Sequence, residues 1–365
     1  MKKTLIALAA LAAAGATLAQ SSVTIYGRMD LGMSSVDTTT GTAAATEAFS
    51  LAGAEGTRTG SRLGFRGTED LGGGLRAGFV YEIGINADRT DAGNAQTRLA
   101  NLSLTGGFGT VVVGTFMNAF DTVRNMSPAH NNIPGGMFTQ AHGTALVHRF
   151  DSRTQNAIAY VSPNFSGFTF SAGTVNEEHT AAGTSQRKYD GFILGLNYTQ
   201  GPLAAQFAFG NLDVGYHTPL LGAGSTPATP SNAEVQNWAL GVRYTLPQVV
   251  VSFVYEDSKL SVPGATLRDF NAWEIGARFP MGAFAPFVTF GQGEITSSAA
   301  LSTALGGGGL NTGSNDTSAW QVGTTYNLSA RTWVYAAFGE FQRDAANGAN
   351  NVKRDGYAIG LVHTF

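Results

Sequence analysis

The chain has 365 residues, a formal net charge of −3, 48 glycines, 23 phenylalanines and no cysteine, and only 13% of its residues are charged. A mildly acidic chain without a basic cluster is poorly suited to binding nucleic acid, whose phosphates attract lysine and arginine. The absence of cysteine excludes a disulfide framework.

The chain opens with a short basic segment and an apolar run. Two lysines precede the unbroken apolar stretch Leu5–Ala14, and Thr17–Ala19 places small residues where a signal peptidase cuts. The run is too short for a transmembrane helix, which takes about 20 apolar residues. We therefore expect residues 1–19 to be a secretory signal peptide. The mature chain then begins at Gln20, and the loss of both lysines takes its net charge from −3 to −5.

The rest of the chain alternates between apolar and polar side chains with the period of two that is typical of β-strands. In Leu75–Asn86, for example, residues with the parity of Phe79 are apolar, whereas those with the parity of Glu82 are mostly polar or glycine. The same alternation is present in Gly191–Thr199, Asn237–Tyr244 and Trp320–Leu328. A soluble sandwich would turn the apolar face to a core, whereas a membrane barrel turns it to lipid and its polar face to a water-filled lumen.

The connections between these segments favour the barrel. We expect tight turns at Leu71–Gly74, Gly106–Gly109, Pro163–Gly167, Gly201–Pro202, Leu246–Gln248, Pro280–Ala283 and Leu328–Arg331. We expect long loops at Thr38–Thr57, Ala87–Gln96, Asn118–His148, Asn176–Arg187, Asp213–Ala233, Ser258–Thr266, Ile295–Asn315 and Arg343–Asn351. Strict alternation of short and long connections puts tight turns at one end and long loops at the other, as in outer-membrane barrels. Seven short and eight long connections predict an all-β, antiparallel barrel of sixteen strands over residues 20–365, in one domain around an aqueous channel.

Several short motifs keep a characteristic order and spacing over the whole mature chain. They are Ser22–Asp30, Ser61–Gly67 with the turn Glu69–Gly72, Thr97–Ala100 with Gly107–Gly109, Arg153–Tyr160 with Ser162–Pro163 and Gly167–Phe168, and the terminal Phe365. Together they resemble the general diffusion porins of Gram-negative bacteria, in particular the β-proteobacterial branch. The resemblance implies an outer-membrane homotrimer, in contact with lipid and lipopolysaccharide, whose third long loop folds inward and narrows the pore. It also implies that the barrel-assembly machinery reads the end of the chain at Phe365.

The resemblance further implies arginines on the wall of the constriction. By motif match these are Arg62, Arg98 and Arg153, with Arg28 nearby. The parity of Arg28, Arg62 and Arg153 is opposite to that of their apolar neighbours, so we expect these three side chains in the lumen. Arg98 shares the parity of Leu102; either a bulge turns it inward or it caps the strand at its loop end.

The expected lumenal charges are mainly basic. By parity the basic set is Arg28, Arg58, Arg62, Arg66, Arg76, Arg153, Arg243, Arg278 and Arg354, and the acidic set is Asp30, Glu82, Glu256, Glu274 and Glu340. Asp121 is the only carboxylate in the expected constriction loop, Asn118–His148. We therefore expect a passive channel for small hydrophilic solutes and ions, with a modest preference for anions.

Motifs for catalysis or for metal binding are not evident. The sequence contains no P-loop, no Gly-x-Ser-x-Gly and no His-Glu-x-x-His, and its six histidines are scattered. We therefore expect neither an enzyme nor a cofactor or metal. Two alternatives stay open: an outer-membrane barrel enzyme, for which Asp121 with His130 is a conceivable pair, and a secreted β-sandwich adhesin.

Overall fold

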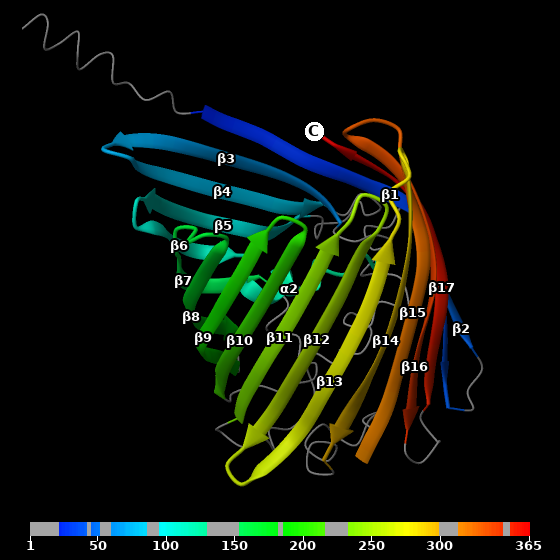
Figure 1. The fold of residues 1–365 in the computed structure, drawn as a ribbon. Coiled ribbons are helices and arrows are strands. Elements are labelled where there is room, and N and C mark those ends of the chain that lie inside the picture. The colour runs from blue at the N-terminus through cyan, green and yellow to red at the C-terminus, as the bar shows by residue number, and fades with distance from the viewer. Residues whose placement is uncertain are drawn as a thin grey trace, which may run out of the picture.

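The structure, a computed structural model, describes residues 22–41, 45–51, 60–85, 95–129, 153–181, 185–215, 233–298, 313–345 and 351–365. Within these ranges the chain forms seventeen strands and the short helix α2 (Ala119–Arg124) (Figure 1). The strands are β1 (Ser22–Thr40), β2 (Thr46–Leu51), β3 (Ser61–Gly72), β4 (Leu75–Ile85), β5 (Ala95–Gly106), β6 (Gly109–Phe116), β7 (Thr154–Val161), β8 (Phe168–Ala181), β9 (Ser185–Gln200), β10 (Leu203–Gly215), β11 (Ala233–Thr245), β12 (Val250–Val262), β13 (Ala265–Arg278), β14 (Phe284–Ser297), β15 (Gly313–Asn327), β16 (Thr332–Ala345) and β17 (Val352–Thr364).

The strands form one closed antiparallel sheet. Each strand from β3 to β17 pairs with the next, and β17 pairs with β1 from Thr364 opposite Arg28 to Val352 opposite Thr40. The other edge of β1 pairs with β3 in its first part and with β2 in its second part, so β2 and β3 share one strand position. The result is the expected sixteen-stranded barrel with one extra strand segment. Closure pairs the first and last strands of the ring, as hydrocarbon requires, and a single ring of strands is not a two-sheet sandwich.

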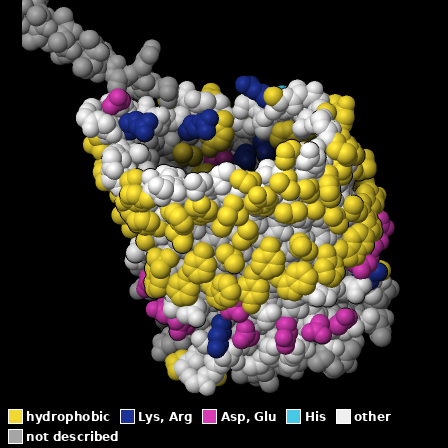
Figure 2. Space-filling model, in the orientation of Figure 1, with side chains coloured by type: hydrophobic (Ala, Val, Ile, Leu, Met, Phe, Trp, Pro, Cys, Tyr) yellow, Lys and Arg dark blue, Asp and Glu magenta, His cyan; other side chains and the backbone are white. Residues whose placement is uncertain are grey.

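The two faces of the barrel differ sharply. Large apolar side chains such as Val23, Leu102 and Ile359 are exposed. On the face that Figure 2 shows, hydrophobic side chains form a broad band across the middle of the barrel wall. Charged and amide side chains such as Glu256 and Gln321 are buried on the inside. This arrangement confirms the lipid-facing and lumenal faces expected from the alternation of side chains, and it avoids the cost of about 2–4 kcal/mol for a basic side chain at mid-depth in lipid.

The loop end of the barrel differs from expectation at three connections. β2 lies within the expected loop Thr38–Thr57, and only residues 182–184 separate β8 from β9 within Asn176–Arg187. The expected long loop Ser258–Thr266 is wrong, because β12 and β13 continue to a two-residue turn in which Gly264 has a φ of +82°. A proline followed by a glycine is the usual chemistry of a type II turn, so these strands project as a hairpin.

The described part of the third loop lies inside the barrel. The side chain of Asn118 caps α2 by accepting hydrogen bonds from the backbone N–H groups of Phe120 (2.9 Å) and Asp121 (3.4 Å). Phe120 and Val123 are fully buried against the lumenal faces of β10 and β11. Burial of such side chains stabilises the docked loop by roughly 1.5–3 kcal/mol each.

No helix in the described ranges is both long enough and apolar enough to cross a membrane. The expected signal peptide, residues 1–19, lies outside the described residues and stays a prediction.

Candidate functional site

A buried carboxylate gathers side chains from three neighbouring strands. Glu82 on β4 is only 4% exposed and points into the lumen. Its carboxylate accepts a hydrogen bond from the hydroxyl of Tyr26 (3.1 Å) and one from Nε of Arg98 (2.7 Å). Nε of Arg62 lies 3.7 Å from the same group. Glu82 was expected in the lumen, but its place between the expected constriction arginines was not foreseen.

A β-bulge turns Arg98 toward this carboxylate. The pairing of β4 with β5 passes from Glu82 opposite Leu99 to Ile83 opposite Thr97, so Arg98 has no partner of its own. An extra residue of this kind reverses the parity of the strand locally. Gly84 leaves room for the side chain, since a β-carbon there would lie 3.2 Å from Cδ of Arg98. The bulge alternative is therefore confirmed over the strand-cap alternative.

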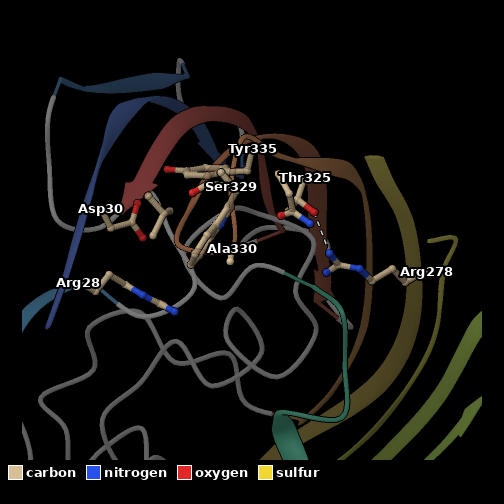
Figure 3. Close-up of a pocket in the computed structure, with 10 residues that line it drawn as sticks. Arg28, Asp30, Arg278, Thr325, Ser329, Ala330 and Tyr335 are labelled. Carbon is tan, nitrogen blue, oxygen red and sulfur yellow. Dashed lines mark hydrogen bonds between the residues drawn. The ribbon is translucent and has the colours of Figure 1, made fainter. Parts of the chain in front are cut away.

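Arg28 and Arg62 face the lumen side by side. They lie directly opposite each other in the pairing of β1 with β3. The guanidinium of Arg28 stacks 5.4 Å from the ring centre of Trp333, and Asp30 lies beside it (Figure 3). Like charges directly opposite each other destabilise a sheet, so the pair of Arg28 and Arg62 lowers the stability of the barrel. This loss of stability suggests that the pair serves another purpose than folding.

Arg153 and Asp121 complete the group. Arg153 precedes β7 and is half-buried, and its charge interacts with those of Arg62, Arg98 and Asp121. Asp121 lies on α2, outside the membrane-spanning strands. Burial raises the pKa of Asp121 to about 6, against the opposing effect of Arg124, Arg153 and Arg98. The charges of Arg28, Arg62, Arg98 and Arg153 thus act on Glu82, and Asp121 interacts with Arg98 and Arg153 from α2.

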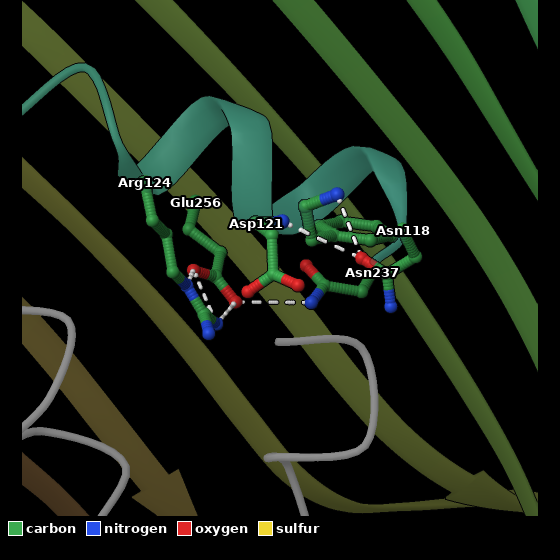
Figure 4. A network of polar contacts seen from close by, with 6 residues as sticks. Asn118, Asp121, Arg124, Asn237 and Glu256 are labelled. Carbon is green, nitrogen blue, oxygen red and sulfur yellow. Dashed lines mark hydrogen bonds and ion pairs between the residues drawn. The ribbon is translucent and has the colours of Figure 1, made fainter. Parts of the chain in front are cut away.

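The loop that carries Asp121 is tied to the far wall of the barrel (Figure 4). Nη2 of Arg124 lies 3.0 Å from Oε1 of Glu256 on β12, and Nε lies 3.3 Å from Oε2. Nδ2 of Asn237 also donates to Glu256, at 3.0 Å, and the hydroxyl of Ser127 donates to Glu274 on β13. Glu256 and Glu274 were expected in the lumen, but their use as anchors was missed because it depends on contacts distant in sequence.

Three lumenal glycines make room for the same loop. A β-carbon at Gly195 would lie 2.8 Å from Cβ of Ala119, and one at Gly241 would lie 2.9 Å from Cγ of Met126. A β-carbon at Gly276 would lie 2.6 Å from Cδ of Pro128. We call Gly195, Gly241 and Gly276 the loop seat. It lies on β9, β11 and β13, away from the strands that carry the arginines.

One expected lumenal carboxylate points outward. Glu340 shares its face of β16 with the exposed Val334 and Phe338, and its Oε2 lies 3.0 Å from Nζ of Lys353. The expectation is wrong because the inward face of β16 carries large aromatic side chains. The polarity of the residues therefore does not distinguish the two faces of this strand.

The alternation of side chains also placed several arginines in the lumen away from the candidate constriction. Arg66 stacks 5.1 Å from the ring centre of Tyr26, and Arg278 donates to the lumenal Thr325. Arg58 and His130 lie outside the described residues. Sequence reasoning missed the inward-facing Arg268 and Arg343, which lie at strand ends beside expected loops.

A closed antiparallel barrel with an apolar outer band, a charged interior and a loop docked inside it is the architecture of an outer-membrane channel. The family model of the Gram-negative porins matches residues 4–346, so the chain belongs to this family. Its location is the outer membrane, and its function is the passive passage of small hydrophilic solutes through a water-filled lumen.

Individual relatives agree with this assignment over nearly their whole length. Outer membrane porin protein 32 of Delftia acidovorans is 30% identical over 380 residues, which cover 99% of this chain and 95% of that protein. Major outer membrane protein P.IB of Neisseria gonorrhoeae is 28% identical, with 100% of both chains covered. Among solved structures, the anion-selective porin from Comamonas acidovorans is similar in fold, with a TM-score of 0.71 and 24% identity over 95% of this chain and 100% of that chain.

Proposed function

We propose that the channel favours anions and that Arg28, Arg62, Arg98 and Arg153 form the positive wall of its constriction, opposite Asp121. The observation that supports this proposal is that the guanidiniums of Arg62 and Arg98 lie at the buried carboxylate of Glu82, while the charges of Arg28 and Arg153 are close enough to interact with it. The similar solved structure from Comamonas acidovorans is described as an anion-selective porin, which agrees with this interpretation.

The charge of the arginine wall is positive. Glu82 and Asp30 oppose the four arginines there, whereas Asp121, Glu256 and Glu274 lie on the loop and on the far wall, where Arg124 neutralises Glu256. A net positive charge between low-dielectric walls concentrates anions and repels cations at close range. Exposed charges act weakly by comparison, since salt screens them over about 8–10 Å.

The reversal potential across a bilayer with a potassium chloride gradient tests this proposal. We expect anion preference in the wild type, a smaller preference in Arg62→Ala and Arg153→Ala, and a decline in all of them as ionic strength rises. Lys353→Ala is the matched control, because this cation lies on the outer face and should leave selectivity unchanged. Cation preference of the wild type at low salt would overturn the proposal.

We also propose that the channel is a homotrimer in contact with outer-membrane lipid and lipopolysaccharide. One similar solved structure, of OmpT from Vibrio cholerae, is described as a trimer form, at 17% identity. Native mass spectrometry in mild detergent should give a mass of three chains. A monomer alone, from protein that conducts, would contradict this proposal.

We further propose that assembly depends on the end of the chain and that residues 1–19 are removed on export. Phe365 exchanges two backbone hydrogen bonds with Gly27, of 3.1 and 3.2 Å, where the barrel closes. An accessible terminal aromatic residue next to the last strand is suited to recognition by the assembly machinery.

Removal of residues 1–19 can be tested by amino-terminal sequencing of membrane-extracted protein, which should begin at Gln20. We infer transport without catalysis, because the Gram-negative porin family and the water-filled lumen account for passive passage.

A further inference from the structure

A recess opens in the lumen wall on the side of the tight turns. It has a volume of about 360 Å³ and lies between β1 and the strands β13 to β17. Arg28 and Arg278 reach toward it from opposite sides, with Ser329, Ala330 and Tyr335 between them (Figure 3). Arg28 belongs to both the candidate constriction and this recess, which extends from there to the turn Leu328–Arg331.

Arg278 supplies the more positive end of this recess. Its Nη2 donates to Oγ1 of Thr325 at 2.7 Å, and it is half-buried at the end of β13. No carboxylate pairs with Arg278 in the part of the chain that the structure describes. Arg28, at the other end, has Asp30 beside it. A guanidinium presents five donors in a fixed fork, so a single hydroxyl partner leaves most of its binding capacity for an anion.

The floor of the recess is apolar and aromatic. Trp333 packs against the buried cluster of Phe287, Tyr335, Ala358 and Val362. Tyr335 and Val362 are each 3% exposed, so this cluster is closely packed. Arg278 at one end and the apolar wall at Trp333 together resemble the usual design of a small-molecule site, while the carboxylate of Asp30 lies at the other end beside Arg28.

We propose that this recess binds a small organic anion that has a carboxylate and an apolar body. The carboxylate takes the free donors of Arg278 beside Thr325, and the apolar body lies along Trp333. This inference deepens the proposed anion preference and rests on it for delivery of the solute. The recess shares only Arg28 with the proposed constriction, and its anchor, Arg278, does not belong to the constriction.

Tryptophan fluorescence can report on the recess directly. The chain has four tryptophans. Trp238, Trp273 and Trp320 contact the exposed Phe207, Phe290 and Phe338 on the outer face, whereas Trp333 lines the recess. In lipid vesicles, the neutral quencher acrylamide should therefore reach Trp333 through the lumen. The difference between the wild type and Trp333→Phe isolates this contribution.

The probe is cyclohexanecarboxylate, which does not absorb where tryptophan is excited. It should protect Trp333 from acrylamide in a saturable manner. The neutral cyclohexanecarboxamide should protect poorly, because it lacks the charge, and acetate should protect poorly, because it lacks the apolar body. Arg278→Gln should weaken protection by at least about tenfold, the lower range for loss of a hydrogen bond to a charged group.

Arg243→Gln is the matched control for a lumenal arginine. Arg243 lies near the tight turns on β11 and does not line the recess. Equal protection in Arg278→Gln and wild type, or equal protection by the carboxamide, would overturn the inference. Protection without anion preference in the salt gradient supports the recess and overturns only the proposed selectivity. Anion preference without protection overturns the recess alone.

Discussion

The buried ion pair between Arg124 and Glu256 should hold the constriction loop in place. The side chain of Arg124 is 14% exposed and that of Glu256 is fully buried, with 3.0 Å between Nη2 and Oε1. Arg124→Met would remove the guanidinium that pairs with the buried carboxylate of Glu256 and keep the hydrogen bond from Asn237. Removal of one partner from a buried pair costs about 3–5 kcal/mol. A loss of about 3 kcal/mol shifts the equilibrium between docked and undocked loop by more than roughly 100-fold.

A second ion pair provides a control of equal length. Nζ of Lys353 also lies 3.0 Å from Glu340, but on the outer surface, where the lysine side chain is 49% exposed. Exposed pairs of this kind contribute less than about 1 kcal/mol. Lys353→Met should therefore leave the loop and the thermal stability nearly unchanged. The comparison separates the effect of burial from that of distance.

Single-channel recording and thermal unfolding measure the outcome. Arg124→Met should show added current noise or extra conductance states from an undocked loop, together with a lower unfolding temperature. Arg124→Met combined with Glu256→Gln should recover part of the loss, since the unpaired charge is gone. Wild-type current noise and stability in Arg124→Met, or a loss no larger than that of Lys353→Met, would refute the reasoning.

Three further predictions concern the loop seat, Asp121 and the end of the chain. Gly241→Val should displace the loop and so raise conductance or lower the folded yield, because a β-carbon at position 241 would lie 2.9 Å from Cγ of Met126. Unchanged single-channel current and yield would contradict this displacement. Since the pKa of Asp121 is raised to about 6, its negative charge is lost as pH falls from 8 to 5. Anion preference should therefore rise with a midpoint near pH 6. The same rise in Asp121→Asn would exclude this cause. Deletion of Phe365 should lower the folded yield in the outer membrane. Gly27→Leu should do the same, because a β-carbon at Gly27 would collide with the ring of Phe365. A normal yield of both variants would count against closure through this contact.

The sequence was sufficient for the barrel and for most of its lumenal face, because alternation is a local pattern. Arg28 and Arg62 could be placed in this way, since their strands keep a regular parity. Arg98 could not, because its bulge depends on the pairing with Glu82 on the neighbouring strand. Glu340 was misplaced where both faces of a strand carry apolar side chains.

The loop anchors were beyond sequence reasoning for a different reason. Arg124 and Glu256 are 132 residues apart, and neither belongs to a recognisable motif. Only the closed barrel brings β12 to the end of α2. The turn at Pro263–Gly264, in contrast, carried a local signal that the polar composition of Ser258–Thr266 obscured.

The separation of the loop seat from the arginine wall has a consequence for how this channel can diversify. The glycines that receive the loop lie on β9, β11 and β13, whereas the arginines come from β1, β3, β5 and the start of β7. If the proposed selectivity holds, a change of Arg28 or Arg62 to a neutral side chain would alter which ions pass while the glycines of the loop seat and the Arg124–Glu256 pair still hold the loop. Width and charge of such a pore could then change independently.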